Sequence, residues 1–189
     1  MKQMGFYFDQ TRCIGCYTCV LACKDWNDLP VGVNWRKINI IENGTFPELF
    51  LAYLSIACNH CVNPPCIKAC PVEAITKRES DGIVIVNSKK CLGKKECDTK
   101  CLKVCPWDIP QFRDDENSKM EKCNFCFDRL EQGKQTICVE ACPMYALDVA
   151  PFEELQKKYG DIHEAEGFNY YEKVRSSIIF KPKFKKRNI

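Results

Sequence analysis

Sixteen cysteines dominate this sequence of 189 residues, and they fall into four groups of four. The first group has the spacing Cys13-x2-Cys16-x2-Cys19-x3-Cys23. In ferredoxins this spacing lets three thiolates bind one iron–sulfur cube while the fourth binds a second cube. Thiolates are soft ligands that suit iron–sulfur clusters, copper(I) and zinc. The first group therefore predicts cluster chemistry.

The other three groups are variants of this pattern. They read Cys58-x2-Cys61-x4-Cys66-x3-Cys70-Pro71, Cys91-x5-Cys97-x3-Cys101-x3-Cys105-Pro106 and Cys123-x2-Cys126-x11-Cys138-x3-Cys142-Pro143. The endings 70–75 and 142–147 resemble each other, which indicates duplicated ferredoxin units. The third group is irregular because Lys94, Lys95 and Glu96 enlarge its first half. We expect all of its cysteines to be ligands, with a three-iron cube or a site lacking one ligand as the alternative.

Zinc and disulfides are the competing interpretations of so many cysteines. Zinc ribbons also use Cys-x2-Cys pairs, and disulfide frameworks are typical of shorter secreted chains. Division into four sets of four, with three Cys-x3-Cys-Pro endings, favours four 4Fe–4S clusters as the cofactors. The sequence shows no phosphate loop, nucleophile–base pair or carboxylate dyad. We therefore expect no catalytic residue in this protein, and we expect its role to be electron transfer.

Charge and hydropathy limit the other functions. The formal net charge is +3, but an oxidised cube with four thiolates carries about −2, so four cubes bring the total to about −5. Basic residues near the cysteines then compensate cluster charge, and no nucleic-acid partner is expected. The longest uncharged apolar stretch, 49–58, is too short to span a membrane. Without a visible leader, the expected location is the cytoplasm or the cytoplasmic face of the membrane, with export bound to a signal-bearing partner as the alternative.

The elements expected around the cysteines are short, and the predicted class is α+β with two ferredoxin-like halves and long loops. A hairpin is predicted from strands at 34–42 and 49–56, and a smaller one turns at 80–82 into a strand at 83–86. Proline first, early acids, late lysines and a final glycine predict a helix over 151–160. The apolar 178–180 and basic 181–187 suit either an arm on a partner subunit or a tail packed on its own domain.

Spacing, length and flanking residues together resemble the four-cluster iron–sulfur subunits of molybdenum and tungsten bis-pterin oxidoreductases. These include subunits of dimethyl sulfoxide, polysulfide and thiosulfate reductases and of formate dehydrogenases. The resemblance is most specific at 5–9, at 28–35 and at Cys58-Asn-His-Cys61 with Pro65-Cys66. It implies a relay between a large catalytic subunit with a molybdenum or tungsten bis-pterin cofactor and an outer partner. That partner would be a membrane anchor, a flavin subunit or a soluble ferredoxin. The alternative is a polyferredoxin-type subunit of a hydrogenase or carbon monoxide dehydrogenase system.

The same resemblance implies which cysteines share a cluster. Groups one and four would form one half, residues 1–57 with 106–160, and groups two and three the other, residues 58–105, with 161–189 as an extension. The implied ligand sets are Cys13, Cys16, Cys19 and Cys142; Cys58, Cys61, Cys66 and Cys105; Cys70, Cys91, Cys97 and Cys101; and Cys23, Cys123, Cys126 and Cys138. The first of these clusters would lie nearest the pterin. The third group departs from the tight x2, x2, x3 spacing that is usual in the family.

Overall fold

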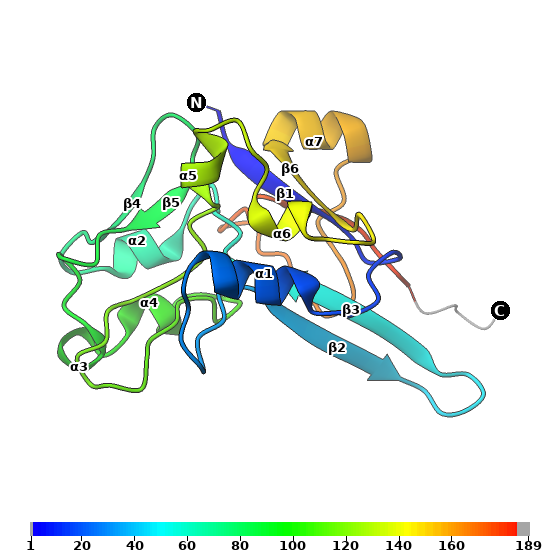
Figure 1. The fold of residues 1–189 in the computed structure, drawn as a ribbon, viewed down its shortest axis with the longest axis horizontal. Coiled ribbons are helices and arrows are strands. Elements are labelled where there is room, and N and C mark those ends of the chain that lie inside the picture. The colour runs from blue at the N-terminus through cyan, green and yellow to red at the C-terminus, as the bar shows by residue number, and fades with distance from the viewer. Residues whose placement is uncertain (1, 185–189) are drawn as a thin grey trace.

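A three-stranded sheet joins segments from both ends of the sequence. The computed structural model describes residues 2–184. Strand β1 (Met4–Asp9) runs antiparallel to β6 (Leu147–Pro151) and parallel to β7 (Ile178–Lys181), as Figure 1 shows. The aromatic side chains of β1 supply much of its packing, since Phe6 and Phe8 are buried in the main core. This sheet fixes the backbone just before the first cysteine group and just after the last.

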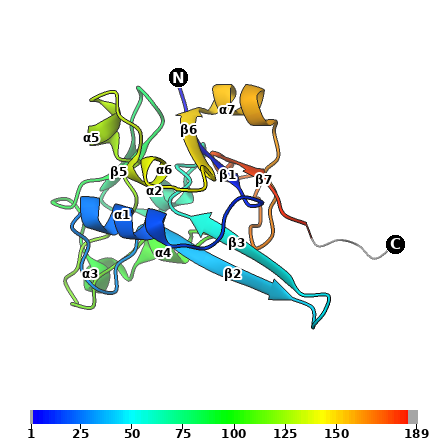
Figure 2. The ribbon, with the colours of Figure 1, turned by 45° about the vertical axis from the view of Figure 1, so that its right-hand side comes forward.

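The predicted long hairpin is present. Strands β2 (Lys37–Asn43) and β3 (Phe50–Ile56) pair antiparallel over their full lengths. Their far end projects away from the rest of the molecule in Figures 1 and 2. Alternate residues of β3 (Phe50, Ala52, Leu54 and Ile56) are buried, because successive side chains of a strand point to opposite faces. The hairpin therefore packs one face toward the core.

The second cysteine group leads into the second predicted hairpin. Helix α2 (Pro65–Ala69) begins with a proline, which fits the first turn of a helix because it lacks an N–H. Strands β4 (Ile75–Lys77) and β5 (Val84–Val86) then pair antiparallel, with the turn where it was predicted. Two single-turn helices, α3 (Lys94–Cys97) and α4 (Lys100–Lys103), carry Cys97 and Cys101 of the third group. The enlarged half of this group thus forms α3.

The remaining helices carry the other cysteines or cover the central sheet. Helix α1 (Thr18–Trp26) packs against α6 (Ile137–Glu140), and α5 (Phe127–Leu130) precedes α6 in the sequence. The predicted helix over 151–160 is α7 (Phe152–Tyr159), which packs on the central sheet. These short strands and helices, joined by long loops, mix α and β elements in one small structure, as expected from the sequence.

Residues 178–180 pack on the protein's own domain. They belong to β7, and the side chains of Ile179 and Phe180 are fully buried. Of the two alternatives for this apolar stretch, the structure takes the tail packed on its own sheet. Most of the basic stretch that follows, from residue 185 onward, lies outside the described residues. Among the described helices, none is long and apolar enough to cross a membrane.

Candidate metal centres

Three hollows in the described part of the protein are each lined by four cysteine side chains, and none of the sixteen cysteines forms a disulfide. The hollows measure about 320, 390 and 320 Å³, including space open to solvent. They define three cysteine sets. These are the Cys13 set (Cys13, Cys16, Cys19, Cys142), the Cys58 set (Cys58, Cys61, Cys66, Cys105) and the Cys91 set (Cys70, Cys91, Cys97, Cys101). Each set combines cysteines from two different groups of the sequence.

The remaining four cysteines form a fourth set, the Cys123 set (Cys23, Cys123, Cys126, Cys138), and all of them are buried. The pKa of the Cys23 thiol is raised to about 12, mainly by burial and also by the Cys138 and Cys126 thiols, while the Arg36 charge opposes this rise. Burial also raises the pKa of Cys123 well above its usual range, with added contributions from Cys23 and Cys126. Cys23 therefore lies near Cys123, Cys126 and Cys138, although these cysteines are far apart in the sequence.

The three Cys-Pro endings fold into the same turn. The third residue after each cysteine, namely Glu73, Asp108 or Tyr145, has a φ of +50° or +51°. This left-handed residue turns the next backbone N–H back toward the sulfur. The N–H of Ala74 donates to Cys70 Sγ at 3.3 Å, and that of Ala146 donates to Cys142 Sγ at 3.4 Å. Such hydrogen bonds to sulfur orient ligands and adjust cluster potentials.

The first group lacks the proline, and its backbone continues as a helix instead. Cys19 and Cys23 lie four residues apart on α1, so both point from its buried side. Cys19 lines the hollow of the Cys13 set, whereas Cys23 lies near Cys138 and Cys126. The Asn27 side-chain amide approaches Cys23 Sγ at 3.8 Å. It takes the place that a turn N–H occupies in the other groups.

The loop between Cys13 and Cys16 is held tightly against the long hairpin. Gly15 has a φ of +69°, and a Cβ at this position would come within 2.4 Å of the Tyr53 ring on β3. Glycine is therefore required both by its conformation and by the close approach. Cys16 itself is exposed, and the Thr18 hydroxyl lies 3.3 Å from its Sγ, which lowers the pKa of this thiol. The Cys13 set thus opens to the surface at Cys16.

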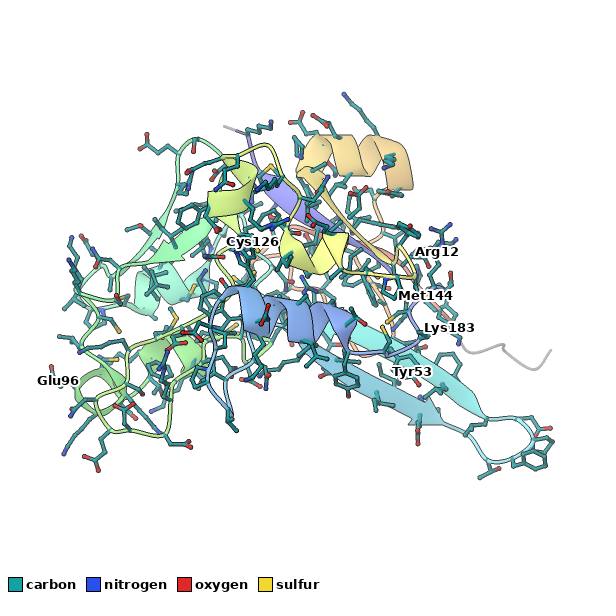
Figure 3. The ribbon with its side chains drawn as sticks, viewed as in Figure 1. Arg12, Tyr53, Glu96, Cys126, Met144 and Lys183 are labelled. Carbon is teal, nitrogen blue, oxygen red and sulfur yellow. The ribbon has the colours of Figure 1, made fainter. Side chains whose placement is uncertain are left out.

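Electrostatic coupling between thiols of different sets indicates a linear order. Burial is the main cause that raises the pKa of Cys19, Cys123 and Cys66, and in each case a thiol of a neighbouring set raises it as well. Cys138 acts on Cys19, Cys58 acts on Cys123, and Cys101 acts on Cys66. The order is therefore Cys13 set, Cys123 set, Cys58 set, Cys91 set. Figure 3 shows the same direction, with Met144 toward the right, Cys126 near the centre and Glu96 at the left edge.

Two buried basic side chains near the thiols were not singled out from the sequence. Arg36 and Lys122 are only 3% and 4% exposed. The first follows Trp35 at the start of the long hairpin, and the second immediately precedes Cys123. In the sequence, their burial is indicated only by a position next to an apolar residue or a cysteine. This indication is weak, because most charged residues at such positions are exposed.

The side chains in these sets fit 4Fe–4S clusters. Every set offers four thiols, the donor type that such clusters use, and backbone or hydroxyl donors lie close to the sulfurs. The buried amide nitrogen of Asn59 lines the hollow of the Cys58 set without a protein acceptor, where a cluster sulfur would supply one. Among residues 2–184, no three His, Cys, Asp or Glu side chains are grouped as a site for a single metal ion.

His60, which lies between Cys58 and Cys61 in the sequence, is part of the protein's packed interior. It is fully buried, and its Nδ1 accepts a hydrogen bond from the Val84 backbone N–H at 2.9 Å. Burial lowers the pKa of His60 well below its usual range, and the charges of Lys122 and Lys77 lower it further. The ring packs edge-on against Phe125. A neutral imidazole therefore links the second and fourth cysteine groups through packing.

Comparison with known proteins agrees with this geometry. A family model described as a 4Fe-4S dicluster domain matches residues 49–151, and one described as a 4Fe-4S binding domain matches residues 6–25. The protein is 46% identical to one of the polypeptides of anaerobic dimethyl sulfoxide reductase from Haemophilus influenzae, over 85% of its own length and 80% of that relative. It is 42% identical to the Escherichia coli protein of the same name, over 95% of its own length and 89% of that relative. It belongs to this family of iron–sulfur subunits.

Membership of the dimethyl sulfoxide reductase iron–sulfur family confirms the resemblance drawn from the sequence. The protein is also 31% identical to one of the subunits of sulfite dehydrogenase from Allochromatium vinosum, over 87% of its own length and 71% of that relative. Its cofactors are four 4Fe–4S clusters, and its role is to relay electrons as a subunit of an oxidoreductase complex. These findings displace the zinc and disulfide interpretations.

Proposed function

We propose that each of the four cysteine sets binds one 4Fe–4S cluster. The support is geometric: four thiols surround each of three hollows, and the last four thiols are buried together. The protein then divides into two ferredoxin-like halves, residues 1–57 with 106–160 and residues 58–105, with 161–189 as an extension. The Cys13 and Cys123 sets draw only on groups one and four, and the other two sets only on groups two and three.

The four clusters form a wire with two accessible ends. The observation that carries this proposal is the distribution of burial: all four cysteines of the Cys123 set and two of the Cys58 set are buried, whereas Cys16 in the Cys13 set is exposed and three cysteines of the Cys91 set are partly exposed. Electrons enter or leave a buried cluster through its neighbours, so the terminal sets are the docking points. Electron transfer between redox proteins needs only a small contact area.

The catalytic subunit docks at the Cys13 end. Apolar side chains surround this end, and Ile14, Tyr17, Met144 and Tyr145 are all exposed. Three of them also line the hollow of the Cys13 set. An exposed apolar rim around a terminal redox site is typical of a protein–protein interface. The partner is a large subunit with a molybdenum or tungsten bis-pterin cofactor.

The outer redox partner docks at the Cys91 end. A membrane anchor, a flavin subunit or a soluble ferredoxin would fill this role. Helix α3, with Lys94, Lys95 and Glu96 all exposed, gives this end a charged surface unlike the apolar rim. The location of the complex follows from that partner: the cytoplasm, the cytoplasmic face of the membrane, or export bound to a signal-bearing subunit. Cell fractionation distinguishes these locations.

Metal analysis of the natively purified complex tests the proposal. We expect sixteen irons for each copy of this protein, together with molybdenum or tungsten in a large co-purifying subunit. Nickel in place of these metals would favour the second candidate, a polyferredoxin-type subunit of a hydrogenase or carbon monoxide dehydrogenase system. A three-iron signal in the oxidised wild-type protein would show that the irregular third group binds an incomplete cluster.

A further inference from the structure

Arg36 and Lys122 are buried cations at the two inner junctions of the cysteine sets. Among the residues that the structure describes, neither forms an ion pair with a carboxylate. Removing an unpaired charge from water is costly, so a buried cation requires a nearby negative charge. The cysteine sets are where that charge arises when iron is bound.

Arg36 lies between the Cys13 set and the Cys123 set. Its Nη1 donates to the Ser55 hydroxyl at 3.0 Å, and that hydroxyl lies 3.5 Å from Cys19 Sγ. Its guanidinium stacks over the Phe6 ring at 5.0 Å, which fixes its orientation. Burial alone would lower the pKa of Arg36, but negative charge on Cys138, Cys19, Cys123 and Cys23 raises it overall. The guanidinium therefore faces ligands of both sets.

Lys122 lies between the Cys123 set and the Cys58 set. Its Nζ donates to the backbone carbonyl of Cys123 at 3.0 Å and to that of Val84. Its side chain also lines the hollow of the Cys58 set. Its positive charge opposes the rise in the pKa of Cys66 that burial causes. The ammonium group is therefore held by the backbone of one set while it faces the thiols of the next.

We propose that Arg36 and Lys122 set the reduction potentials of the inner wire, each by stabilising the reduced state of the two clusters that flank it. This proposal rests on the ligand sets proposed above. Each cluster accepts one electron from its neighbour, so its charge with four thiolates changes from about −2 to about −3. A fixed cation a few ångströms away, in an interior of low dielectric, favours the more negative state. Neither residue is a ligand of a cluster. Each acts on the neighbouring clusters through its positive charge.

The two cations predict a distinct pattern of shifts. Arg36 affects the clusters of the Cys13 and Cys123 sets, whereas Lys122 affects those of the Cys123 and Cys58 sets. The cluster of the Cys123 set is therefore stabilised in its reduced form by both charges. The cluster of the Cys91 set is affected by neither. A general loss of stability would not produce this pattern.

Potentiometric titration of the purified complex, followed by electron paramagnetic resonance, tests the pattern in Arg36→Gln and Lys122→Met. We expect the reduction equilibrium of each flanking cluster to weaken at least tenfold, which is about 59 mV for a one-electron couple. In the double variant the shared step should shift by the product of the two fold-changes. Cys→Ser variants of single sets assign the steps. Unchanged potentials in fully loaded single variants would overturn the proposal.

Lys100→Met is the matched control, because Lys100 lines the hollow of the Cys91 set but is exposed. Solvent screens its charge, so its removal should shift a potential much less. If the charge-removing variants lose iron, the charge-conserving variants Arg36→Lys and Lys122→Arg distinguish an effect of charge from an effect of packing. Full iron content and near-native potentials in these two support the proposal. Loss of iron in them as well shows a role in packing and overturns it.

The same titration separates this proposal from the one on which it rests. Wild-type complex with fewer than four one-electron 4Fe–4S steps would contradict the ligand sets themselves. Four wild-type steps that do not move when either cation is replaced would contradict only the role of Arg36 and Lys122. Four steps that move in the expected pairs support both.

Discussion

Cys23 is the residue at which the order of ligands in the sequence and their order in space differ. It closes the first cysteine group, yet it lies among the buried thiols of the Cys123 set. Cys19, one helical turn earlier, lines the hollow of the Cys13 set. Because α1 is a regular helix between them, the two thiols are separated along its axis by about 6 Å, which places them at adjacent sites. A single helical turn thus connects the Cys13 set to the Cys123 set.

Replacing Cys23 by serine should therefore damage the cluster of the Cys123 set and leave that of the Cys13 set intact. Serine is a much poorer ligand for iron than a thiolate. We expect one cluster signal to be lost or converted to a three-iron signal, measured by electron paramagnetic resonance and iron content. Cys19→Ser is the matched control and should damage the other cluster. Loss of only the Cys13-set cluster in Cys23→Ser would refute the pairing.

Residue types explain what the sequence predicted well and what it did not. The sixteen cysteines were identifiable because iron–sulfur clusters impose fixed local spacings. Arg36, Lys122 and Asn27 carry no such spacing, since each reaches the thiols through a contact that depends on the packed structure. Arg36, for example, lies against Ser55 from the neighbouring strand and Phe6 from a different sheet. Spacing predicts ligands, whereas the groups around them depend on tertiary contacts.

At the scale of elements, β7 closes the central sheet beside the first cysteine group. Phe180 is 0% exposed and packs edge-on against Phe8 and at a tilt against Phe168. Phe180→Ala should lower the free energy of unfolding by about 3–5 kcal/mol, the usual cost of removing a buried phenylalanine side chain. The measurement is the guanidinium midpoint for loss of cluster absorbance. Phe184→Ala is the control, because Phe184 is 65% exposed and its removal should cost little.

Strand β1 also carries a tyrosine that makes stability sensitive to alkaline pH. Burial and, to a smaller extent, the charge of Asp9, whose Oδ2 lies 3.4 Å from the hydroxyl, together raise the pKa of Tyr7 to about 12. The unfolded polypeptide loses this proton near pH 10 while the folded protein keeps it. Stability from the neutral hydroxyl is therefore present below pH 10 and is lost as pH rises toward 12.

Tyr7→Phe should accordingly lose less stability than the wild type between pH 8 and pH 11, as measured by guanidinium midpoints at both values. The phenyl ring keeps the stacking on Tyr159, whose ring centre is 3.6 Å away, so packing is largely conserved. Tyr145→Phe is the control, because this side chain is 78% exposed and its variant should follow the wild type. A parallel fall of Tyr7→Phe and wild type would contradict the expectation.

Local signals account for the elements that the sequence predicted. Both hairpins and helix α7 depend on turn residues and side-chain periodicity within a short segment, and all three are present. The parallel pairing of β7 with β1 joins residues about 170 positions apart, as in Phe6 opposite Ile178. No local pattern specifies such a partner, so both alternatives for this stretch remained open until the structure placed it.

At the scale of the whole molecule, Figure 3 shows Met144 beside the Cys13 set toward the right, Cys126 of the Cys123 set near the centre, and Glu96, next to Cys97 of the Cys91 set, at the left edge. The terminal sets have exposed or partly exposed cysteines, and the Cys123 set has none. Apolar groups such as Phe125 and neutral His60 fill the space between the Cys58 and Cys123 sets. Such an interior keeps water away from the Cys123 set, whose four cysteines are all buried.

A linear wire predicts that removal of an inner cluster disconnects the two ends. Cys126→Ser removes a ligand of the Cys123 set without changing either docking surface, since Cys126 is buried beside α5. We expect the catalytic subunit to reduce the Cys13-set cluster at its normal rate, while reduction of the Cys91-set cluster slows at least a hundredfold. Rapid-freeze electron paramagnetic resonance of the complex, started with substrate or its reduced product, follows both steps.

A small soluble reductant supplies the control for this experiment. It reaches the partly exposed Cys91 end directly, so that cluster should still be reduced in Cys126→Ser at the wild-type rate. Slow reduction from both sources would mean that the substitution had damaged the terminal cluster itself. Unimpaired reduction from the catalytic subunit would mean that electrons bypass the Cys123 set, and the linear order of the four clusters would then be wrong.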